Sequence, residues 1–412
     1  MHKLKNYGDV KDRPISISQK NITIRNILSL VMRSHSFLVL GHSYSDVDCI
    51  SSMLAISLLL RKFHKYVTIY VKDRFPSSIS FFQKICEYND INLLISNSEG
   101  LEKPDAIFIL DTPKPEMISL DDKILNFFLQ KSIPKIEIDH HFSEDARHSG
   151  DIPYRLTLRA SSSAEIIAHM CQKLSKHKHV LEKNAVGELY SRNIVMVMAA
   201  GMMGDAKKGG YLATKRDVSF FKYFLNKFDA ILKNSSYEGS ANVSSVDEML
   251  GLLEKMTEEQ MHLYDAIKKE VSFKDNIGVL TLDEKTSYNL YSSLGDFSVF
   301  IEVIRSITDE LSNFPHDASV SCFYYPSSIS SFVEFRVRAS ENLRGIDFRS
   351  LIDIMEVPDG NGGGHPGAIC FKVEKHLISD IKEYVASLIF NVENIISEYN
   401  EKKHECNAKN QL

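Results

Sequence analysis

The order of apolar and polar positions predicts alternating helices and strands in the first part of the chain. Asn21–Met32 and Asp48–Leu60 carry apolar residues at helical spacing, whereas Phe37–Leu40 and Tyr66–Val71 are short apolar or β-branched runs of strand length. A strand, a helix and a second strand in this order form a βαβ unit, whose strands pair in parallel. We therefore expect a parallel sheet.

Two further apolar runs extend the predicted sheet, and each stops at a carboxylate. Ala106–Leu110 ends before Asp111, Lys135–Ile138 ends before Asp139, and the first strand ends at His42. Open parallel sheets bind ligands in the crevice beyond the carboxyl ends of their strands. We therefore expect His42, Asp111 and Asp139 to face one crevice.

The second half of the chain predicts a separate domain. Residues 234–245 are rich in Ser, Asn and Gly, and the charged amphipathic segment 248–271 that follows reads as one helix connecting two domains. Beyond it, strand patterns at 277–282, 318–325 and 332–339 alternate with helical patterns at 297–311 and 377–399. The expected fold class is α/β, with a parallel-sheet catalytic domain joined by a helical linker to a smaller mixed α/β domain. The predicted division is a polar N-terminal arm 1–20, the catalytic domain 21–233, a loop and helical linker 234–272, a substrate-binding domain 273–399 and a polar tail 400–412.

Composition narrows the function classes. A chain of 412 residues with 43% hydrophobic content suffices for two domain cores, and a net charge of -5 argues against a protein that tracks long nucleic acid. The six cysteines contain no CxxC pair, which favours a reducing compartment over a disulfide framework or zinc ribbon. Residues 1–14 lack the apolar core of a signal peptide, and 194–203 is too short to span a bilayer. We expect a soluble cytoplasmic protein without a membrane partner.

Four polar clusters carry the candidate chemistry. They are His42 with Asp46 and Asp48, Asp111 alone, Asp139 with His140 and His141, and Asp205 after a glycine. Carboxylates and imidazoles without a thiolate suit Mn²⁺ or a similar divalent ion, and two acids as close as Asp46 and Asp48 need a cation when buried. Alone, an Asp-x-Asp is usually solvated or a helix cap, and a His pair usually lies on the surface. The coincidence of all four clusters favours a metal centre for phosphoester hydrolysis, which uses two ions about 3.5 to 4 Å apart.

Two neighbouring polar segments have structural interpretations. Ser162 and Glu165 match a capping box at a helix start, which favours a cap over a ligand role. Lys207 and Lys208 follow Asp205, where a phosphate contact and a solvated turn are equally good interpretations.

A glycine-rich motif in the second domain is a candidate for substrate binding. Gly362, Gly363 and Gly364 let the backbone approach a phosphate or base closely, although a flexible turn is the alternative. Because His365 follows the glycines and Arg338 lies on the preceding predicted strand with Arg336, we favour a substrate loop. An arginine there would hold a terminal phosphate bidentately.

These motifs together resemble the DHH phosphoesterase family, which is named for the sequence found here at 139–141. The resemblance extends from Phe37 to Val373, and all four motifs of the catalytic domain occur in order. The glycine loop resembles that of the DHH-associated C-terminal domain of oligoribonucleases, cyclic-di-AMP phosphodiesterases and RecJ-like exonucleases. Departures from the usual pattern, such as Ser45 and Val47, replace no proposed metal ligand.

The resemblance implies two divalent metal ions, Mn²⁺ first among the candidates. One ion would be held by His42, Asp46 and Asp111, and the other by Asp48, Asp111, His140 and Asp205, with Asp111 bridging. His141 would contact the scissile phosphate, and Asp139 would orient the histidines, a role whose loss commonly weakens metal binding. Arg338 and His365, with Gly362, Gly363 and Gly364, would hold the far end of a nucleotide.

The function expected from these residues is a manganese-dependent phosphodiesterase. Its substrate partners would be short oligonucleotides or dinucleotides such as linear di-adenylate, cleaved to mononucleotides, and also 3',5'-bisphosphate nucleotides. Hydrolysis of cyclic di-AMP is the close alternative. A pyrophosphatase or polyphosphatase, against which the glycine loop argues, and a non-catalytic nucleotide sensor, against which the complete ligand set argues, are more distant ones. The sequence leaves the oligomeric state open, a homodimer included.

Overall fold

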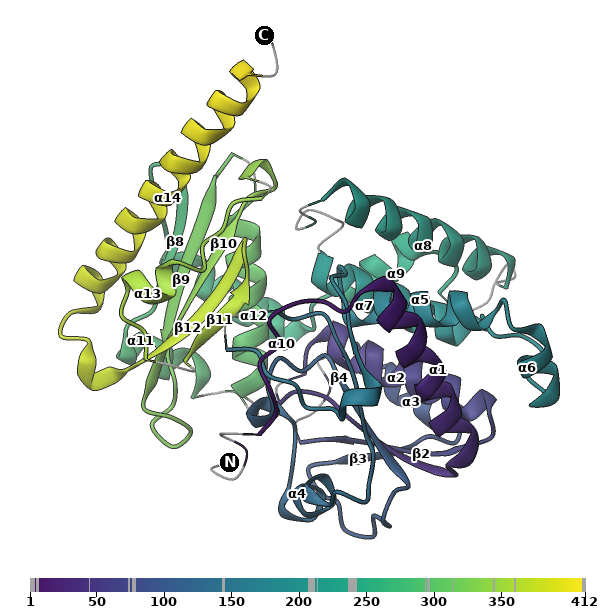
Figure 1. Cartoon of the computed structure of the whole chain (residues 1–412). Helices are drawn as coiled ribbons and strands as arrows, with labels where there is room; N and C mark the ends of the chain where they lie inside the picture. The colour runs from purple at the N-terminus through teal and green to yellow at the C-terminus, as the bar shows by residue number, and fades with distance from the viewer. Residues whose placement is uncertain are drawn as a thin grey trace. The chain divides into compact units, whose positions relative to one another are not determined.

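The chain folds into two compact units, which are described separately. The computed structural model describes residues 4, 7–43, 45–72, 75, 79–142, 145–206, 212, 214–235, 243–292, 294, 297–313, 315–343, 345–358 and 361–409. The first unit comprises 1–209 and 214–255, and the second comprises 210–213 and 256–412 (Figure 1). The segment 234–272, predicted as a linker, lies on both sides of this division. Lys207 and Lys208 lie outside the described residues.

A six-stranded sheet forms the centre of the first unit. Its strands are β1 (Ser36–Leu40), β2 (Tyr66–Val71), β3 (Asn92–Ile95), β4 (Ala106–Leu110), β5 (Lys135–Asp139) and β6 (Arg155–Thr157). They are arranged in the order β3-β2-β1-β4-β5-β6, and each pair is parallel. The predicted parallel sheet is therefore confirmed. All five residues of β4 and of β5 are buried, as expected of strands covered on both faces.

Nine helices are described in the first unit. They are α1 (Ile17–Arg33), α2 (Val47–Lys62), α3 (Phe82–Tyr88), α4 (Asp122–Leu129), α5 (Ser163–Leu174), α6 (Lys178–Lys183), α7 (Arg192–Ala206), α8 (Lys215–Asn234) and α9 (Val246–Leu253). Helix α2 is buried continuously from Asp48 to Leu60, because α7 and α5 pack on it as well as the sheet. Helix α1 begins four residues before the predicted start, since Ser16 and Gln19 form a capping box there.

The second unit contains a mixed sheet. Its strands are β7 (Val271–Lys274), β8 (Ile277–Thr281), β9 (Ala318–Tyr324), β10 (Phe332–Ala339), β11 (Gly362–His365) and β12 (Ala368–Glu374). The order is β11-β12-β10-β9-β8-β7, and among these only β8 and β9 pair in parallel. This sheet confirms the expected mixed α/β architecture.

Helices cover the second sheet on both faces. They are α10 (Glu258–Ile267), α11 (Glu284–Tyr291), α12 (Phe297–Leu311), α13 (Leu351–Ile354) and α14 (Ile381–Lys409). One core lies under α14 and the other under α10 and α12. The segment 248–271, expected as one helix, is divided into α9 and α10 because Thr257 caps a new helix start with Gln260. Helix α14 continues past the predicted end at Tyr399.

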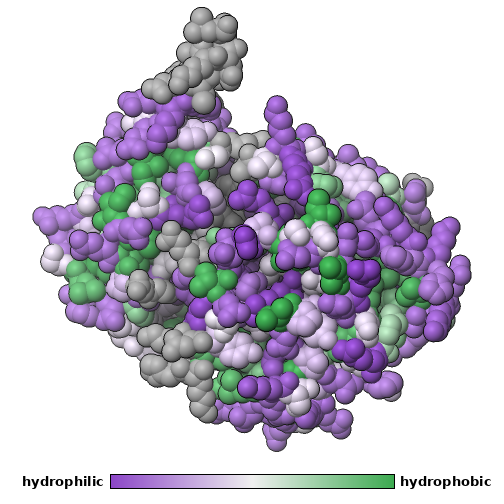
Figure 2. Space-filling view, in the orientation of Figure 1, coloured by the Kyte–Doolittle hydropathy of each residue, from purple (hydrophilic) through white to green (hydrophobic). Residues whose placement is uncertain are grey.

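Polar residues dominate the surface seen in Figure 2, with apolar residues scattered over it. Such scattered apolar residues are ordinary on a folded protein. Among the described residues, no helix combines the length and the apolar character that crossing a bilayer requires.

Candidate metal centre

The parallel sheet places the predicted ligands at one edge of the first unit. His42 follows β1, Asp111 follows β4, and Asp139 ends β5, with His140 next in the chain. Because every strand pair is parallel, the ends of these neighbouring strands share the carboxyl edge of the sheet. The other ligands come from helices covering that edge: Asp46 and Asp48 from the start of α2, and Asp205 from the end of α7.

Short distances between side chains show that these residues form one cluster. His42 Nε2 lies 3.6 Å from Asp46 Oδ1 and 3.7 Å from Asp111 Oδ2. His140 Nε2 lies 3.3 Å from Asp111 Oδ1 and 3.1 Å from Asp205 Oδ2. Asp111 therefore faces one imidazole with each carboxylate oxygen. We call His42, Asp46, Asp48, Asp111, His140 and Asp205 the candidate metal centre.

The donors of the candidate metal centre form groups of metal-binding size. Asp48, His140 and Asp205 offer ligand atoms within 4.8 Å of one another, and so do Asp111, His140 and His141. A third such group joins His42 and Asp111 to Cys49. Asp111 belongs to two of the groups, as the predicted bridging residue would.

Asp111 adopts an unusual backbone conformation at the end of β4. Its φ is 51°, in the left-handed region, which Asp and Asn tolerate better than most other residues that have a side chain. Its N–H donates to Ile138 O at 3.0 Å, which ties the turn to the next strand. The Ser163 hydroxyl donates to Asp111 Oδ1 at 2.9 Å. Backbone and side chain are thus both held in place.

Asp48 is held by the start of helix α5. The backbone N–H groups of Ser163 and Ala164 donate to its two carboxylate oxygens at 2.6 and 3.0 Å, and Ser52 Oγ donates at 3.2 Å. Gly201 on α7 leaves room for this carboxylate, since a Cβ there would lie 2.7 Å from Asp48 Oδ1. Burial and the neighbouring acids Asp111 and Asp205 nevertheless raise the pKa of Asp48 well above its usual value.

The capping interpretation of the Ser-rich segment before α5 is confirmed in part. Ser162 Oγ accepts the N–H of Glu165 at 3.1 Å, which caps the helix. The Glu165 carboxylate accepts from the N–H of Ser161 at 3.0 Å, not from that of Ser162, so the reciprocal bond of the capping box is displaced by one residue. Ser163, which the sequence analysis did not single out, supplies the contacts with Asp48 and Asp111. Its place in a helix cap was the only signal for it.

The orientation of two histidines directs their Nε2 atoms to the acids. His42 Nδ1 lies 2.8 Å from Ser43 O, and His140 Nδ1 lies 3.3 Å from Ala160 O. A carbonyl only accepts, so each Nδ1 carries the hydrogen and each Nε2 keeps its lone pair in the neutral ring. Burial would lower the pKa of His140, but Asp111 and Asp205 outweigh it and raise the pKa well above normal. Carboxylates this close to an imidazole nitrogen need a positive charge between them, which a proton or a metal ion can supply, and oxygen and imidazole donors fit a divalent metal ion.

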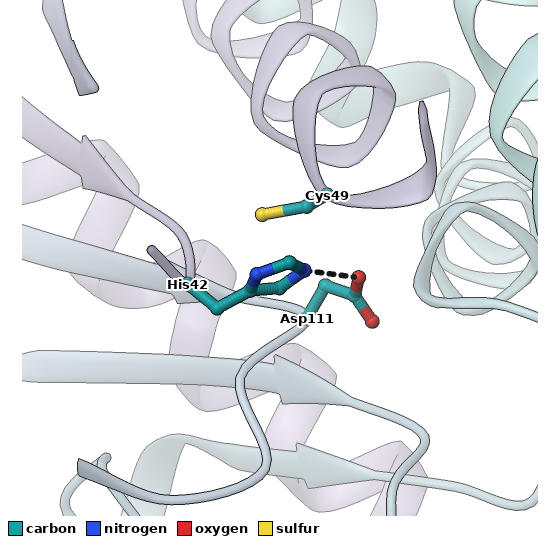
Figure 3. Close-up of side chains that lie close together, drawn as sticks. All are labelled: His42, Cys49 and Asp111. Atoms are coloured by element: carbon teal, nitrogen blue, oxygen red, sulfur yellow. Dashed lines mark ion pairs between the residues drawn. The ribbon is translucent and has the colours of Figure 1, made fainter. Parts of the chain in front are cut away.

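Cys49 is a neighbour that the sequence analysis missed. Its side chain lies beside His42 and Asp111, as the close-up shows (Figure 3), and it belongs to the first turn of α2. The thiol is completely buried, and burial raises its pKa despite His42 nearby. Because metals bind the thiolate, a protonated Cys49 is a poor ligand. Its position near His42 was not readable from a lone cysteine in the sequence.

Asp139 has a different set of partners from the other acids. One oxygen lies 2.8 Å from His141 Nδ1, and the other accepts from Lys11 Nζ at 2.6 Å. Burial would raise the pKa of Asp139, but Lys11 and His141 lower it, so the carboxylate is ionised. An ionised carboxylate only accepts, and His141 therefore donates from Nδ1. The contact with His141 is one that the expected orienting role requires, and that role stays a prediction. Lys11 in the N-terminal arm had no sequence signal.

The predicted substrate residues lie in the second unit. Arg338 on β10 reaches Asp309 with Nε at 3.2 Å and donates from Nη1 to the carbonyls of Val337 and Ile369. Gly362, Gly363 and Gly364 form strand β11, so the backbone there is not a free turn. Only the backbone of His365 belongs to the described part of the chain.

Glycine is required at one position of this strand. Gly364 has a φ of 138°, and a Cβ there would lie 2.3 Å from Ala368 O. At Gly363 a Cβ would meet nothing within 4 Å, so the backbone at this residue faces open space.

Another charge cluster is centred on Glu334 and Arg336, two buried residues of β10. Glu334 forms an ion pair with Arg336, accepts from Tyr325 Oη at 2.6 Å and lies 3.6 Å from Lys372 Nζ. Burial would raise the pKa of Glu334, but Arg336 and Lys372 lower it to about 2. We call these four residues the β10 charge cluster.

Comparison with known proteins agrees with this architecture. Residues 36–202 match the model of the DHH family, N-terminal domain. The cyclic-di-AMP phosphodiesterase PdeA of Listeria monocytogenes serotype 1/2a (strain 10403S) is 25% identical over 147 residues, which are 34% of this chain. The match spans only 22% of the length of PdeA.

A solved structure matches over both units. An exopolyphosphatase-related protein from Bacteroides fragilis aligns with 93% of this chain and 96% of its own, at a TM-score of 0.57 and 17% identity. At that identity the likeness shows the fold alone. The family model covers the strands and helices that carry His42, Asp48, Asp111 and His140, so this part of the chain is similar to the N-terminal domain of the DHH family.

Proposed function

We propose that the chain is a metal-dependent phosphodiesterase that hydrolyses short oligonucleotides or dinucleotides to mononucleotides. The observation that carries the proposal is Asp111, whose two oxygens face His42 and His140 at 3.7 and 3.3 Å. One carboxylate between two groups of donors suits a pair of divalent ions. The match to the DHH family domain supports the same reaction class.

The residues divide into two ligand sets around Asp111. His42 and Asp46 would complete one, and Asp48, His140 and Asp205 the other, with Mn²⁺ the ion that this mixture of oxygen and imidazole donors suits. Two such ions, when bound, activate water and stabilise charge on the phosphate and the leaving oxygen. The backbone N–H groups of Ser163 and Ala164, at the start of α5, donate to Asp48 and hold its carboxylate in place in the second ligand set.

His141 and Asp139 would act on the phosphate side. Asp139 accepts from His141 Nδ1 at 2.8 Å and so fixes which ring nitrogen carries the hydrogen. In this proposal, Nε2 of His141 would contact an oxygen of the scissile phosphate. Asp139 is a positioning residue in this proposal, because its two oxygens are used by His141 and Lys11.

Binding of the nucleotide is assigned to the second unit. Arg338 would hold a phosphate, and the backbone of Gly363 faces open space where a base or phosphate can approach. His365 is part of this proposal by resemblance to the DHH-associated domain. We infer a small nucleotide, with no long nucleic acid and no membrane as partner.

Cyclic di-AMP is the second candidate substrate. The similarity to PdeA, whose name gives it this activity, favours it. Linear di-adenylate and cyclic di-AMP present the same phosphodiester to the metal centre, so binding by the second unit would decide between them.

One experiment tests the proposal. The purified protein is incubated with Mn²⁺ and, in separate reactions, with linear di-adenylate, a longer oligonucleotide, cyclic di-AMP, 3',5'-bisphosphorylated adenosine, pyrophosphate and polyphosphate, and the products are separated by chromatography. We expect adenosine monophosphate from the linear dinucleotide at the highest rate. Hydrolysis of pyrophosphate or polyphosphate alone would replace the proposal, and no turnover of any substrate would remove the enzyme interpretation.

Replacement of Arg338 tests the substrate assignment. Arg338→Ala should raise KM about 10 to 100-fold, the loss expected for a hydrogen bond to a charged phosphate, and leave kcat within about threefold. Arg349→Ala is the matched control, since Arg349 of the same unit forms an ion pair with Asp347, two positions away in the sequence. A drop in kcat at unchanged KM would show that Arg338 does not bind substrate.

A further inference from the structure

A lysine of the N-terminal arm is completely enclosed in the first unit. Lys11 is 1% exposed, and its Nζ donates to Asp139 Oδ2 at 2.6 Å and to Thr112 O at 2.8 Å and forms an ion pair with Glu137 Oε1 at 2.8 Å. Two hydrogen bonds and one ion pair thus surround the buried ammonium group of Lys11. A buried charge with this set of partners is specifically placed.

The acceptors of Lys11 belong to the two strand ends that carry the candidate metal centre. Thr112 directly follows Asp111 at the end of β4, and Asp139 ends β5 immediately before His140. The second oxygen of Asp139 accepts from His141 Nδ1 at 2.8 Å. The Asp139 carboxylate is therefore held between Lys11 and the histidine assigned to the phosphate.

Backbone contacts of the N-terminal arm hold the Lys11 side chain in this position. The N–H of Lys11 donates to Ala146 O at 2.8 Å, the N–H of His148 donates to Asp9 O at 2.8 Å, and Val10 bridges Arg147 in antiparallel fashion. Gly8 lies directly before this pairing and has a φ of 78°. There is no space for a Cβ at this position, since it would lie 1.8 Å from His148 O. Residues 8–11 thus lie along the loop that follows the DHH motif.

Glu137 and Asp139 depend on Lys11 to different degrees. Glu137 also accepts from Gly150 N at 3.2 Å and lies 2.9 Å from His148 Nδ1, so it keeps partners without the lysine. Asp139 Oδ2 points to Lys11. Loss of Lys11 would therefore free Asp139, and with it the ring of His141, more than it would disturb Glu137.

We propose that Lys11 is a positioning residue of the phosphoesterase site, which fixes the Asp139 carboxylate and through it the orientation of His141. The proposal rests on the proposed function for the role of His141. It makes the N-terminal arm a part of the active site, although the arm lies outside the segment matched by the family model.

The test compares two variants that share one background. Lys11→Met alone leaves two buried carboxylates and would endanger folding, so Glu137→Gln is compared with Lys11→Met combined with Glu137→Gln. We expect the combined variant to bind Mn²⁺ about 10 to 100-fold more weakly than Glu137→Gln, in a titration followed by the electron paramagnetic resonance of free Mn²⁺. Its kcat should fall with KM nearly unchanged. The ¹⁵N-labelled imidazole of His141 should lose its protected Nδ1–H signal.

Two controls separate this role from a general loss of packing. Lys135→Met removes another buried lysine of the same unit, which donates to Gln130 O at 2.8 Å, and should leave Mn²⁺ binding and the His141 signal unchanged. In an Asp139→Asn background, Lys11→Met should weaken Mn²⁺ binding no further, because the two residues act through one contact.

Defined results would overturn the proposal. An unchanged His141 signal and an unchanged Mn²⁺ affinity in the combined variant would show that Lys11 is only structural, and so would additive losses in the Asp139→Asn background. The His141 spectrum needs neither metal nor substrate. It therefore decides about Lys11 even if the protein hydrolyses none of the nucleotides, a result that would remove only the proposed function.

Discussion

The candidate metal centre and the β10 charge cluster differ in how their charge is balanced. In the candidate metal centre, burial together with Asp111 and Asp205 raises the pKa of Asp48 well above normal. In the β10 charge cluster, Arg336 and Lys372 overcome burial and lower the pKa of Glu334 to about 2. Asp111 and Asp205 oppose the ionisation of Asp48, whereas Glu334 in the second cluster lies beside the cations Arg336 and Lys372. The first cluster is thus arranged for a charge supplied from outside the chain, and the second is complete.

Among the substitutions that test this difference between the two clusters, Asp111→Asn should have the largest effect. Asp111→Asn should lower kcat about 10³-fold, since the several kcal/mol supplied by metal ions correspond to a factor of that size. The same substitution should raise the melting temperature of the metal-free protein, because it removes a charge that opposes ionised Asp48. Steady-state kinetics and calorimetry in EDTA measure the two effects. A lower melting temperature with full activity would contradict both the bridging role and the charge argument.

Glu334→Gln should have the opposite effect on stability. It leaves Arg336 buried without its anion and should lower the unfolding free energy by about 3 kcal/mol at pH 7. The folded-state pKa of Glu334 is lower than its usual value of 4.5, so its contribution is present above pH 4.5 and is lost as the pH falls toward about 2. Urea unfolding of both proteins, followed by circular dichroism, should show the difference shrinking over that range. An equal difference at pH 7 and pH 2.5 would show that ion pairing does not stabilise this cluster.

The next largest effect that should distinguish the two clusters is the stabilisation of the protein by added Mn²⁺. At 100 times its dissociation constant, Mn²⁺ should stabilise the wild-type protein by about 2.7 kcal/mol through mass action. Glu334→Gln should show the same increment, because its cluster needs no metal, while Asp111→Asn should lose it. Melting temperatures with and without Mn²⁺ provide the measurement, and an increment retained by Asp111→Asn would place the ion elsewhere.

The smallest expected effect concerns the hydroxyl of Ser163. Ser163→Ala removes the hydrogen bond to Asp111 at 2.9 Å but keeps the backbone N–H on Asp48, so Mn²⁺ affinity should fall by about tenfold. Ser57→Ala is a matched control, since that buried hydroxyl bonds Met53 O within helix α2. Isothermal titration measures both. An equal loss in the two variants would point to packing and not to the metal centre.

The sequence predicted the first sheet and the positions of its ligands because both follow from local rules. Apolar runs such as Ala106–Leu110 marked the strands, and parallel pairing placed their ends together. The strand-end acids then had to converge. The six proposed ligands do so, and their roles remain predictions.

Contacts from segments distant in sequence were not predictable in this way. Lys11 reaches Asp139 across 128 positions of the chain, and Ser163 reaches Asp111 across 52. Neither residue has a pattern of its own, because a lysine in a polar arm and a serine in a helix cap are both ordinary. Cys49 also has no sequence pattern that would predict its position beside His42. Only the packing of helices and arm on the sheet reveals these neighbours.

The left-handed backbone of Asp111 has an evolutionary consequence. At a φ of 51°, Asn is the other residue with a comparable side chain that tolerates the conformation well, and Asp and Asn codons differ by one base. A single nucleotide change would therefore yield a descendant that keeps the turn and the fold while losing the negative charge of Asp111. Under the proposed function, duplicated copies of such a gene would have a short route from an enzyme to a protein that only binds its nucleotide.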